Sequence, residues 1–289
     1  MAAIAACLYV RNAETDIQEW IAYHRSIGIK AFLIYDNGST DSTVAKAEAM
    51  APIAVIRLVP WGHSTGVGAQ GEAYSDCIER FRKEFEWIIF LDSDEFLVSV
   101  DGQQVESLLT GHFFHSAIAF NWVCFGSSGH VEIPTGLTTE NFTRRSDDAF
   151  DPNRQTKVMV RPDLVRRYVN PHYFEMDGQF VRPDGSAVDW DKDGITKIVD
   201  ISKWRIHHYF VRSQAHWAAK LARGYRDVTR EADLFSIYDR NEILDMTVAN
   251  RSASVHALIK QAAYQSRGKE KTSAIRSWLR RALRQMRLD

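Results

Sequence analysis

Three carboxylates gather at Asp92, Asp94 and Glu95, directly after the apolar run WIIFL over residues 87–91. Like charges this close repel one another, so the arrangement calls for a cation. Two carboxylates at the end of a rigid strand can hold Mn2+ or Mg2+, which prefer oxygen ligands and fill their remaining positions with water and phosphate. Such a cation bridges diphosphate oxygens and stabilises charge on a departing nucleotide. A helix cap is the alternative, since Ser and Asp often follow strands. The buried strand before the cluster favours the cation site.

A second acid, Asp36, follows the apolar run AFLIY and opens the turn DNGSTDST. A carboxylate beside free backbone N–H groups near a helix N-terminus suits a nucleoside, with Asp36 accepting a hydrogen bond from the base or the ribose. The alternative is an ordinary strand–turn–helix in which Asp41 caps the helix. In the segment IHHYFVRS, His207 and His208 point to opposite faces of a strand, so at most one of them faces the site. There a neutral imidazole completes a cation shell or binds phosphate, whereas the alternative is a structural histidine.

The acidic turn DWDKDG matches the start of an EF-hand calcium loop at Asp189, Asp191, Asp193 and Gly194, with Asp200 at the twelfth position. An EF-hand requires Glu at that position and a helix before the loop, and the sequence supplies neither. We therefore predict a solvated turn rather than a calcium site.

Strand and helix patterns alternate through the first ninety residues. Apolar runs predict strands at residues 4–10, 31–35, 53–58 and 87–91. Helical spacing predicts helices at residues 17–27, from about 41 to 50 and around 74–85. This alternation implies an α/β fold with a parallel sheet, and ligands of such sheets bind outside the carboxyl ends of the strands. The polar residues expected to converge at those ends are Asn12, Glu14, Asp36, Asp92 and Asp94.

The pattern loosens after residue 100. Further strands are predicted at residues 116–126, 156–160, 165–169 and 204–210, and turn residues between 177 and 194 indicate a surface hairpin. A helix is predicted from Ser213 to Arg223, and the end of the chain is helical in character.

Composition and charge limit the possible functions. The 289 residues carry a formal net charge of -1, so no global basic field draws the chain to nucleic acid. Residues 267–289 nevertheless hold eight Lys or Arg and two Asp or Glu, a net charge of +6 that leaves -7 for the rest. A basic amphipathic helix containing Trp278 can lie on an anionic membrane, or it can dock on the protein. Widely spaced cysteines and no signal-like N-terminus favour a reducing, cytoplasmic setting, with peripheral contact at the inner face of the membrane.

Taken together, several segments resemble glycosyltransferase family 92, a group similar to family 2. These are RNAETDIQEWIAYHRSIGIKAFLIYDNGSTDST, FLDSDEFL, NWVCFGSSGH, KVMVRPDLV and IHHYFVRSQAHWAAKLARG, which occur in order over residues 4–224. The resemblance implies a GT-A fold: a Rossmann-like, mostly parallel sheet with flanking helices. It also implies inverting sugar transfer from a nucleotide donor, commonly UDP-galactose in animal members, to a glycan or glycolipid acceptor with a divalent cation.

The resemblance also assigns domains and roles. Residues 1–230 form the glycosyltransferase domain, with a nucleotide-sugar half (1–100) and an acceptor half (101–230), and residues 231–289 form a helical extension. Asp92 and Asp94 match the cation-binding pair, with Asp94 catalytic in this role. The remaining matches are Asp36 at the base and ribose, the donor loop of Arg11, Asn12 and Glu14, His208 near the diphosphate and metal, and the pocket residues Lys157, Arg161 and His172. Arg11 stands where a Lys is frequent in the family.

The catalytic base should be a carboxylate that removes the acceptor hydroxyl proton. Glu140 is our first candidate, and Asp147, Asp148 and Asp177 also follow the presumed acceptor strand.

Two other functions compete with sugar transfer. A haloacid-dehalogenase-type phosphatase would use Asp92 as nucleophile, but it expects Thr or Val two residues after the second Asp, where Phe96 stands. A non-enzymatic carbohydrate-binding module would explain the many aromatic residues but would not need the acidic trio.

Overall fold

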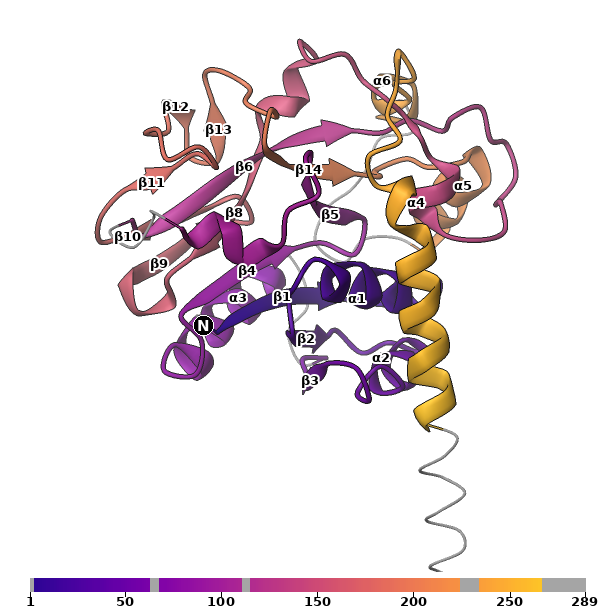
Figure 1. Cartoon of the computed structure of the whole chain (residues 1–289), viewed down its shortest axis with the longest axis horizontal. Coiled ribbons are helices and arrows are strands. Elements are labelled where there is room, and N and C mark those ends of the chain that lie inside the picture. The colour runs from indigo at the N-terminus through magenta and orange to yellow at the C-terminus, as the bar shows by residue number, and fades with distance from the viewer. Residues whose placement is uncertain (1–2, 63–67, 111–114, 224–233, 267–289) are drawn as a thin grey trace, which may run out of the picture.

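A nine-stranded sheet forms the centre of the protein in a computed structural model that describes residues 3–62, 68–110, 115–223 and 234–266 (Figure 1). The strands follow the order β3-β2-β1-β4-β8-β6-β14-β5, with β11 beside β6. Their bounds are β1 Ile4–Val10, β2 Ala31–Asp36, β3 Val55–Pro60, β4 Trp87–Leu91, β5 Glu95–Ser99, β6 Ala117–Cys124, β8 Thr156–Val160, β11 Phe180–Val181 and β14 Trp204–His208.

Strand direction determines which chain segments meet at each edge of the sheet. The strands β3, β2, β1 and β4 are parallel to their neighbours, and β14 is parallel to β6. By contrast, β8 is antiparallel to β4 and β6, and β5 is antiparallel to β14. The carboxyl ends of the parallel strands therefore share one edge with the first residues of β5 and β8. This confirms the predicted α/β class with a mostly parallel sheet, and its first four strands have the order of doubly wound nucleotide-binding sheets.

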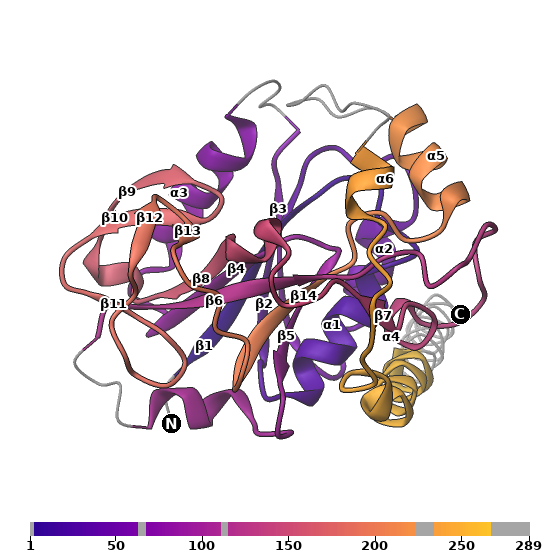
Figure 2. The ribbon, with the colours of Figure 1, turned by 90° about the horizontal axis from the view of Figure 1, so that it is seen from above.

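Helices cover both faces of the sheet because alternate strand residues point to opposite sides. On one face, Leu8 of β1 shares a core cluster with Trp20 of α1 (Ile17–Ser26), and α2 (Thr43–Glu48) lies beside α1. On the other face, Cys7 shares a cluster with Tyr74 of α3 (Ala69–Phe81). Figure 2 shows α1 and α3 on opposite sides of β1 and β4.

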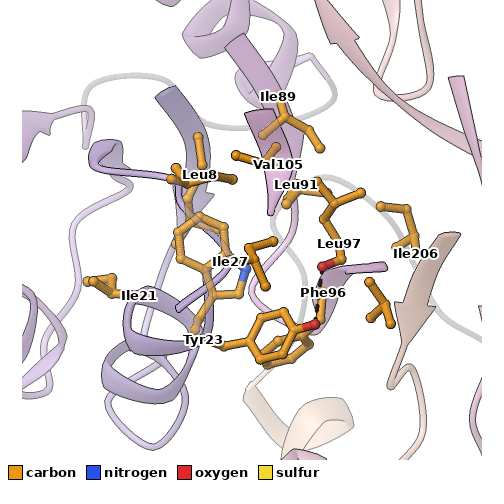
Figure 3. Packing of buried hydrophobic residues seen from close by; sticks show 14 of the residues in the cluster. Leu8, Ile21, Tyr23, Ile27, Ile89, Leu91, Phe96, Leu97, Val105 and Ile206 are labelled. Carbon is orange, nitrogen blue, oxygen red and sulfur yellow. Dashed lines mark hydrogen bonds between the residues drawn. The ribbon is translucent and has the colours of Figure 1, made fainter. Parts of the chain in front are cut away.

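The helix α1 fixes the turn between β4 and β5, which carries the acidic cluster. The indole Nε1 of Trp20 donates to the carbonyl oxygens of Asp92 (3.1 Å) and Glu95 (3.0 Å). The hydroxyl of Tyr23 donates to the Leu97 carbonyl oxygen at 3.2 Å, as Figure 3 shows, and His24 Nε2 accepts from the Leu97 N–H at 3.1 Å. The backbone around the acids is therefore held by side chains that are themselves fully buried in the core.

Smaller elements surround this frame. Three two-stranded sheets pair β9 (Val165–Asn170) with β10 (Tyr173–Met176), β12 (Trp190–Lys192) with β13 (Ile195–Thr196), and β7 (Arg144–Arg145) with β15 (Ile243–Leu244). The remaining named helices are α4 (Thr138–Asn141), α5 (Gln214–Arg223) and α6 (Leu234–Tyr238), and a further helix covers residues 252–266, drawn in yellow in Figure 1.

Most predicted elements are confirmed, with differences that include the following. The strand predicted at 53–58 is β3 at Val55–Pro60, because Ile53 belongs to a turn in which its N–H donates to the Met50 carbonyl oxygen. The strand β5 was not predicted. The N-cap of α2 is Ser42 rather than Asp41, although the Asp41 carboxylate accepts the Thr43 N–H at 2.9 Å.

The helix at residues 252–266 packs against the main core through Val255 and Ala262. In the described part of the chain, no helix combines the length and apolar character that a membrane span requires. The basic segment with Trp278 lies outside the described residues. Its membrane contact and the cytoplasmic location both stay predictions.

Candidate active site

The acidic cluster lies where the edge of the sheet brings together several strand ends. Asp92 and Asp94 occupy the turn after β4, and Glu95 is the first residue of β5. Lys157 is the second residue of β8, and His208 is the last residue of β14, paired in register with Glu95. Segments more than one hundred residues apart in sequence thus contribute to one site.

A buried lysine holds two of the three carboxylates. Lys157 Nζ donates to Asp92 Oδ2 at 2.8 Å and lies 3.2 Å from Glu95 Oε2, and neither Lys157 nor Glu95 has any exposed side-chain area. The other Asp92 oxygen accepts from Gln70 Nε2 at 2.8 Å. Burial would raise the pKa of Asp92, but Lys157 outweighs it and lowers this pKa. Burial raises the pKa of Glu95 to about 8.

The third carboxylate, Asp94, has different partners. Its Oδ2 accepts from Lys220 Nζ of α5 at 2.8 Å, and its Oδ1 lies 3.8 Å from His208 Nε2. Burial would raise the pKa of Asp94, but Lys220 and His208 hold it well below its ordinary value. Arg212 forms a bidentate pair with Asp16 at 2.8 and 2.9 Å, and its charge also acts on Asp94.

The chain's own cations therefore make the acidic cluster tolerable. The sequence suggested that a metal and a nucleotide neutralise the three carboxylates. The structure instead surrounds them with two buried ammonium groups, Lys157 and Lys220. Lys157 was predicted to line the donor pocket. In the structure it is fully buried and binds Asp92 and Glu95 instead.

A divalent cation nevertheless fits beside Asp94. Among the described residues, no three His, Cys, Asp or Glu side chains gather to hold a metal on their own. Mg2+ and similar ions need only one or two protein ligands when water and phosphate supply the rest. Asp94 is ionised, and burial lowers the pKa of His208 to about 3, so its imidazole is neutral and able to ligate. The ring nitrogen Nδ1 of His208 is buried and finds no hydrogen-bond partner among the described residues.

The two adjacent histidines have separate roles, as strand alternation predicted. His208 faces Asp94, whereas His207 accepts from Arg205 Nε at 2.9 Å through its own Nε2. Arg205 and Arg145 both donate to Asp245, at 2.5 and 3.0 Å, so His207 belongs to a buried ion network that ties the segment after α6 to the sheet. His207 is therefore a structural histidine.

An aromatic wall joins His208 to His172. The indole ring of Trp122 on β6 lies 4.1 Å from the His208 ring and 5.1 Å from the His172 ring, measured between centroids. His172 Nδ1 lies 2.7 Å from the Thr156 carbonyl oxygen, and burial together with Lys157 lowers the pKa of His172 to about 4. His172 is thus neutral at pH 7 and is close enough to Asp92 for that charge to act on it, while its place in a donor pocket stays a prediction.

The predicted donor loop interlocks with the turn after β2. Asn12 adopts a positive φ of 52°, and its Oδ1 accepts the Thr40 N–H at 2.8 Å. The Glu14 carboxylate accepts the Ser42 N–H at 3.3 Å, and Asp36 accepts the Ser39 N–H at 3.2 Å. These contacts shape the loops at the ends of β1 and β2, next to the end of β4.

Arg11 and Arg161 are the two remaining basic residues of the predicted donor site. The Arg11 Nε is buried and has no hydrogen-bond partner in the described part of the chain, while Arg161 pairs with Asp163 at 3.4 Å.

The candidate catalytic bases form their hydrogen bonds and ion pairs with residues outside the acidic cluster. Glu140 accepts the Leu137 N–H at 3.2 Å at the start of α4, and its other oxygen lies 3.0 Å from His256 Nε2. Asp148 pairs with Arg145 at 2.7 Å, Asp147 accepts the Ala149 N–H, and Asp177 pairs with Arg166. None of these contacts within the described residues is shared with Asp92 or Asp94.

The turn DWDKDG is not built like a calcium loop. Asp189 pairs with Lys197 at 3.0 Å, and Asp191 pairs with Arg154. These carboxylates point to separate cations around the β12–β13 hairpin, which confirms the prediction of a solvated turn.

Sequence reasoning missed three contributors to the site: Lys220, Gln70 and Trp20. Each lies on a helix and hydrogen-bonds to the acidic turn, although at least 22 residues of sequence separate it from its partner there. A lysine on an amphipathic helix is typical of a solvated surface, so no local signal identifies Lys220.

Comparison with known proteins gives three results. The sequence pattern described as "Glycosyltransferase family 92" matches residues 4–209. A glycosyltransferase family 92 protein of Oryza sativa subsp. japonica is 33% identical over 168 residues, covering 56% of this chain and 27% of the rice protein. One from Ricinus communis is 28% identical over 182 residues, covering 60% of this chain and 32% of that protein. The chain thus spans about a third or less of these relatives.

Among solved structures, residues 1–349 of S. aureus TarS in complex with UDP are similar at a TM-score of 0.37 and 14% identity. That similarity covers 55% of this chain and 46% of TarS 1–349.

Proposed function

Because this chain belongs to glycosyltransferase family 92, we propose that it transfers a sugar from a nucleotide donor to a hydroxyl group of a glycan or glycolipid, with inversion and with Mn2+ or Mg2+. The proposed donor is a UDP-hexose of the galactose type. The proposal rests above all on the ionised Asp94 facing the neutral His208 at the sheet edge where parallel strands end.

The donor would lie along the ends of β2, β1 and β4, which are adjacent in the sheet. Asp36 at the end of β2 would accept hydrogen bonds from the base or the ribose. The Asn12 and Glu14 loop supports the turn beside it through Thr40 and Ser42. The diphosphate would then reach the turn after β4.

Asp94 and His208 would hold the divalent cation, which would neutralise the diphosphate and stabilise the leaving nucleotide. Lys157 keeps Asp92 ionised and fixed, and Trp20 holds the backbone of the turn, so the site is preorganised around the developing charge. The acceptor oxygen attacks C1 from the face opposite the nucleotide, its proton passes to a carboxylate, and the bond between C1 and the diphosphate breaks. Our candidate base is Glu140, whose carboxylate would have to leave His256 to reach the acceptor.

The geometry disfavours the phosphatase alternative. Both carboxylate oxygens of Asp92 already accept hydrogen bonds, from Gln70 and from the buried Lys157. An aspartyl nucleophile needs one oxygen directed at the substrate. A carbohydrate-binding module, for its part, would have no need of an ionised Asp94 facing a neutral His208.

A donor screen tests the proposal. Nucleotide-sugars are incubated with the protein and Mn2+, and released nucleotide is measured; we expect turnover with a UDP-hexose that disappears in an Asp92→Ala/Asp94→Ala variant. Asp189→Ala/Asp191→Ala is the matched control, since it removes a D-x-D pair from an exposed hairpin. Turnover of p-nitrophenyl phosphate in place of nucleotide-sugars would favour the phosphatase, and sugar binding without turnover would favour the binding module.

A further inference from the structure

Lys220 occupies an unusual position for a helix lysine. Its Nζ donates to Asp94 Oδ2 at 2.8 Å and to the Phe210 carbonyl oxygen at 2.8 Å, and it lies 4.5 Å from the centroid of the Phe210 ring. The side chains of Lys220 and Asp94 are only 13% and 14% exposed. Such a pair is screened little by solvent or salt, unlike a surface pair. The proposed metal ligand therefore already has a strong cationic partner.

The charges around Asp94 are close to balance without any ligand. The carboxylates are Asp16, Asp92, Asp94 and Glu95, and the cations are Lys157, Lys220 and Arg212. Three cations thus already face these four carboxylates, and Asp92 and Asp94 each have an ammonium group within 2.8 Å.

A divalent cation that entered this site alone would give it an excess of positive charge in a largely buried place, which is costly. A cation that entered together with a diphosphate would bring its own negative charges. Lys220 would then have a second anion within its reach when the cation takes over Asp94.

We propose that Lys220 is the counter-ion that Asp94 exchanges for the divalent cation, and that the Lys220 ammonium group then contacts the diphosphate of the bound nucleotide. The inference rests on the proposed function, because it concerns the same nucleotide site. It makes cation and nucleotide bind as a pair: the cation alone binds weakly because it competes with Lys220. Lys220 is thereby a substrate-contacting residue supplied by α5.

The experiment measures ligand affinity by isothermal titration calorimetry for the wild-type chain and for Lys220→Met. The ligands are Mn2+ alone, UDP alone in EDTA, and both together. Lys220→Met should bind Mn2+ alone at least about tenfold more tightly, or 1.4 kcal/mol, because Asp94 loses its competitor. The same variant should bind UDP in EDTA at least about tenfold more weakly, because the diphosphate loses a cation. Opposite changes for the two ligands are not expected of a variant that merely loosens the structure.

Two further variants complete the design. Lys220→Arg keeps the charge and should retain most of the UDP affinity in EDTA. Lys197→Met is the matched control, since Lys197 pairs with Asp189 at a similar distance on the exposed hairpin, and it should change neither affinity. A folded Lys220→Met protein, shown by its circular dichroism and melting curve, with unchanged or weaker Mn2+ affinity would overturn the inference. If the wild type failed to bind UDP even with Mn2+, the proposed function would fail instead, while the Mn2+ titration would still test the competition for Asp94.

Discussion

The substitution Glu95→Gln should change how the free energy of unfolding depends on pH. Glu95 is fully buried at the start of β5, where its Oε2 accepts the Asp92 N–H at 2.8 Å. Burial raises its pKa from 4.5 to about 8. A carboxyl group with a raised pKa stabilises the folded state fully below its unfolded pKa, and this contribution is lost as the pH rises toward 8.

The window in which Glu95 dominates follows from the other buried groups. Five buried or half-buried histidines have lowered pKa values, so they favour the folded state increasingly as the pH rises to about 6.5. These are His24, His172, His207, His208 and His216. Their contribution fades above pH 6.5 as the histidines of the unfolded state lose their protons, and it is the same in the wild type and in Glu95→Gln, so the difference between these two proteins isolates Glu95. The 1.5 pH units from about 6.5 to 8, at about 1.36 kcal/mol each, correspond to a loss of about 2 kcal/mol.

Urea unfolding at several pH values between about 6.5 and 8.5 measures this loss. The wild type should lose about 2 kcal/mol more than Glu95→Gln over the interval, because the amide cannot ionise. Glu79→Gln is the control, since Glu79 has a 78% exposed side chain on α3, and its curve should follow the wild type. Parallel curves for wild type and Glu95→Gln would refute the reasoning, since they would mean that Glu95 is already ionised at neutral pH.

Four further substitutions probe separate parts of the molecule. Asp245→Ala should lower the free energy of unfolding by about 3–5 kcal/mol in urea titrations, because it leaves the buried Arg205 guanidinium without its carboxylate and removes one of the two carboxylates of Arg145; a loss below about 1 kcal/mol would contradict this. Glu140→Gln should abolish sugar transfer and leave UDP affinity unchanged, whereas normal turnover would remove Glu140 from the role of base. His208→Ala should weaken Mn2+ binding in the presence of UDP by at least about tenfold, while His207→Ala should lower the melting temperature and leave that affinity intact. Equal effects of the two histidines on Mn2+ binding would argue against the assignment.

The pattern of apolar residues predicted those strands whose burial can be recognised in the local sequence. The strands β1, β2 and β4 are continuous apolar runs because both of their faces are buried, and this pattern is visible without any contact information. The strand β5 was missed because it begins directly after a three-residue turn and becomes a strand only by pairing with β14, more than one hundred residues later.

In the site, too, residues with a local sequence signal were predicted, and those placed by long-range contacts were not. Asp92 and Asp94 were predicted from their place after a buried strand, and His208 was singled out from its neighbour by the two-residue period of a strand. Lys220 contacts Asp94 across 126 residues, and nothing in its helix distinguishes it from a solvated lysine. The burial of Lys157 likewise follows from the antiparallel placement of β8 between β4 and β6. Contacts of this kind depend on the complete sheet, not on any local spacing.

The most direct test is anomalous diffraction at the manganese edge from crystals grown with Mn2+ and UDP. We predict one ion within about 2.2 Å of both Asp94 and His208, in contact with the UDP diphosphate, with Asp92 still bound to Lys157. An ion bound elsewhere, or UDP lying away from the ends of β2 and β4, would contradict the assignment of this edge of the sheet as the nucleotide-sugar site.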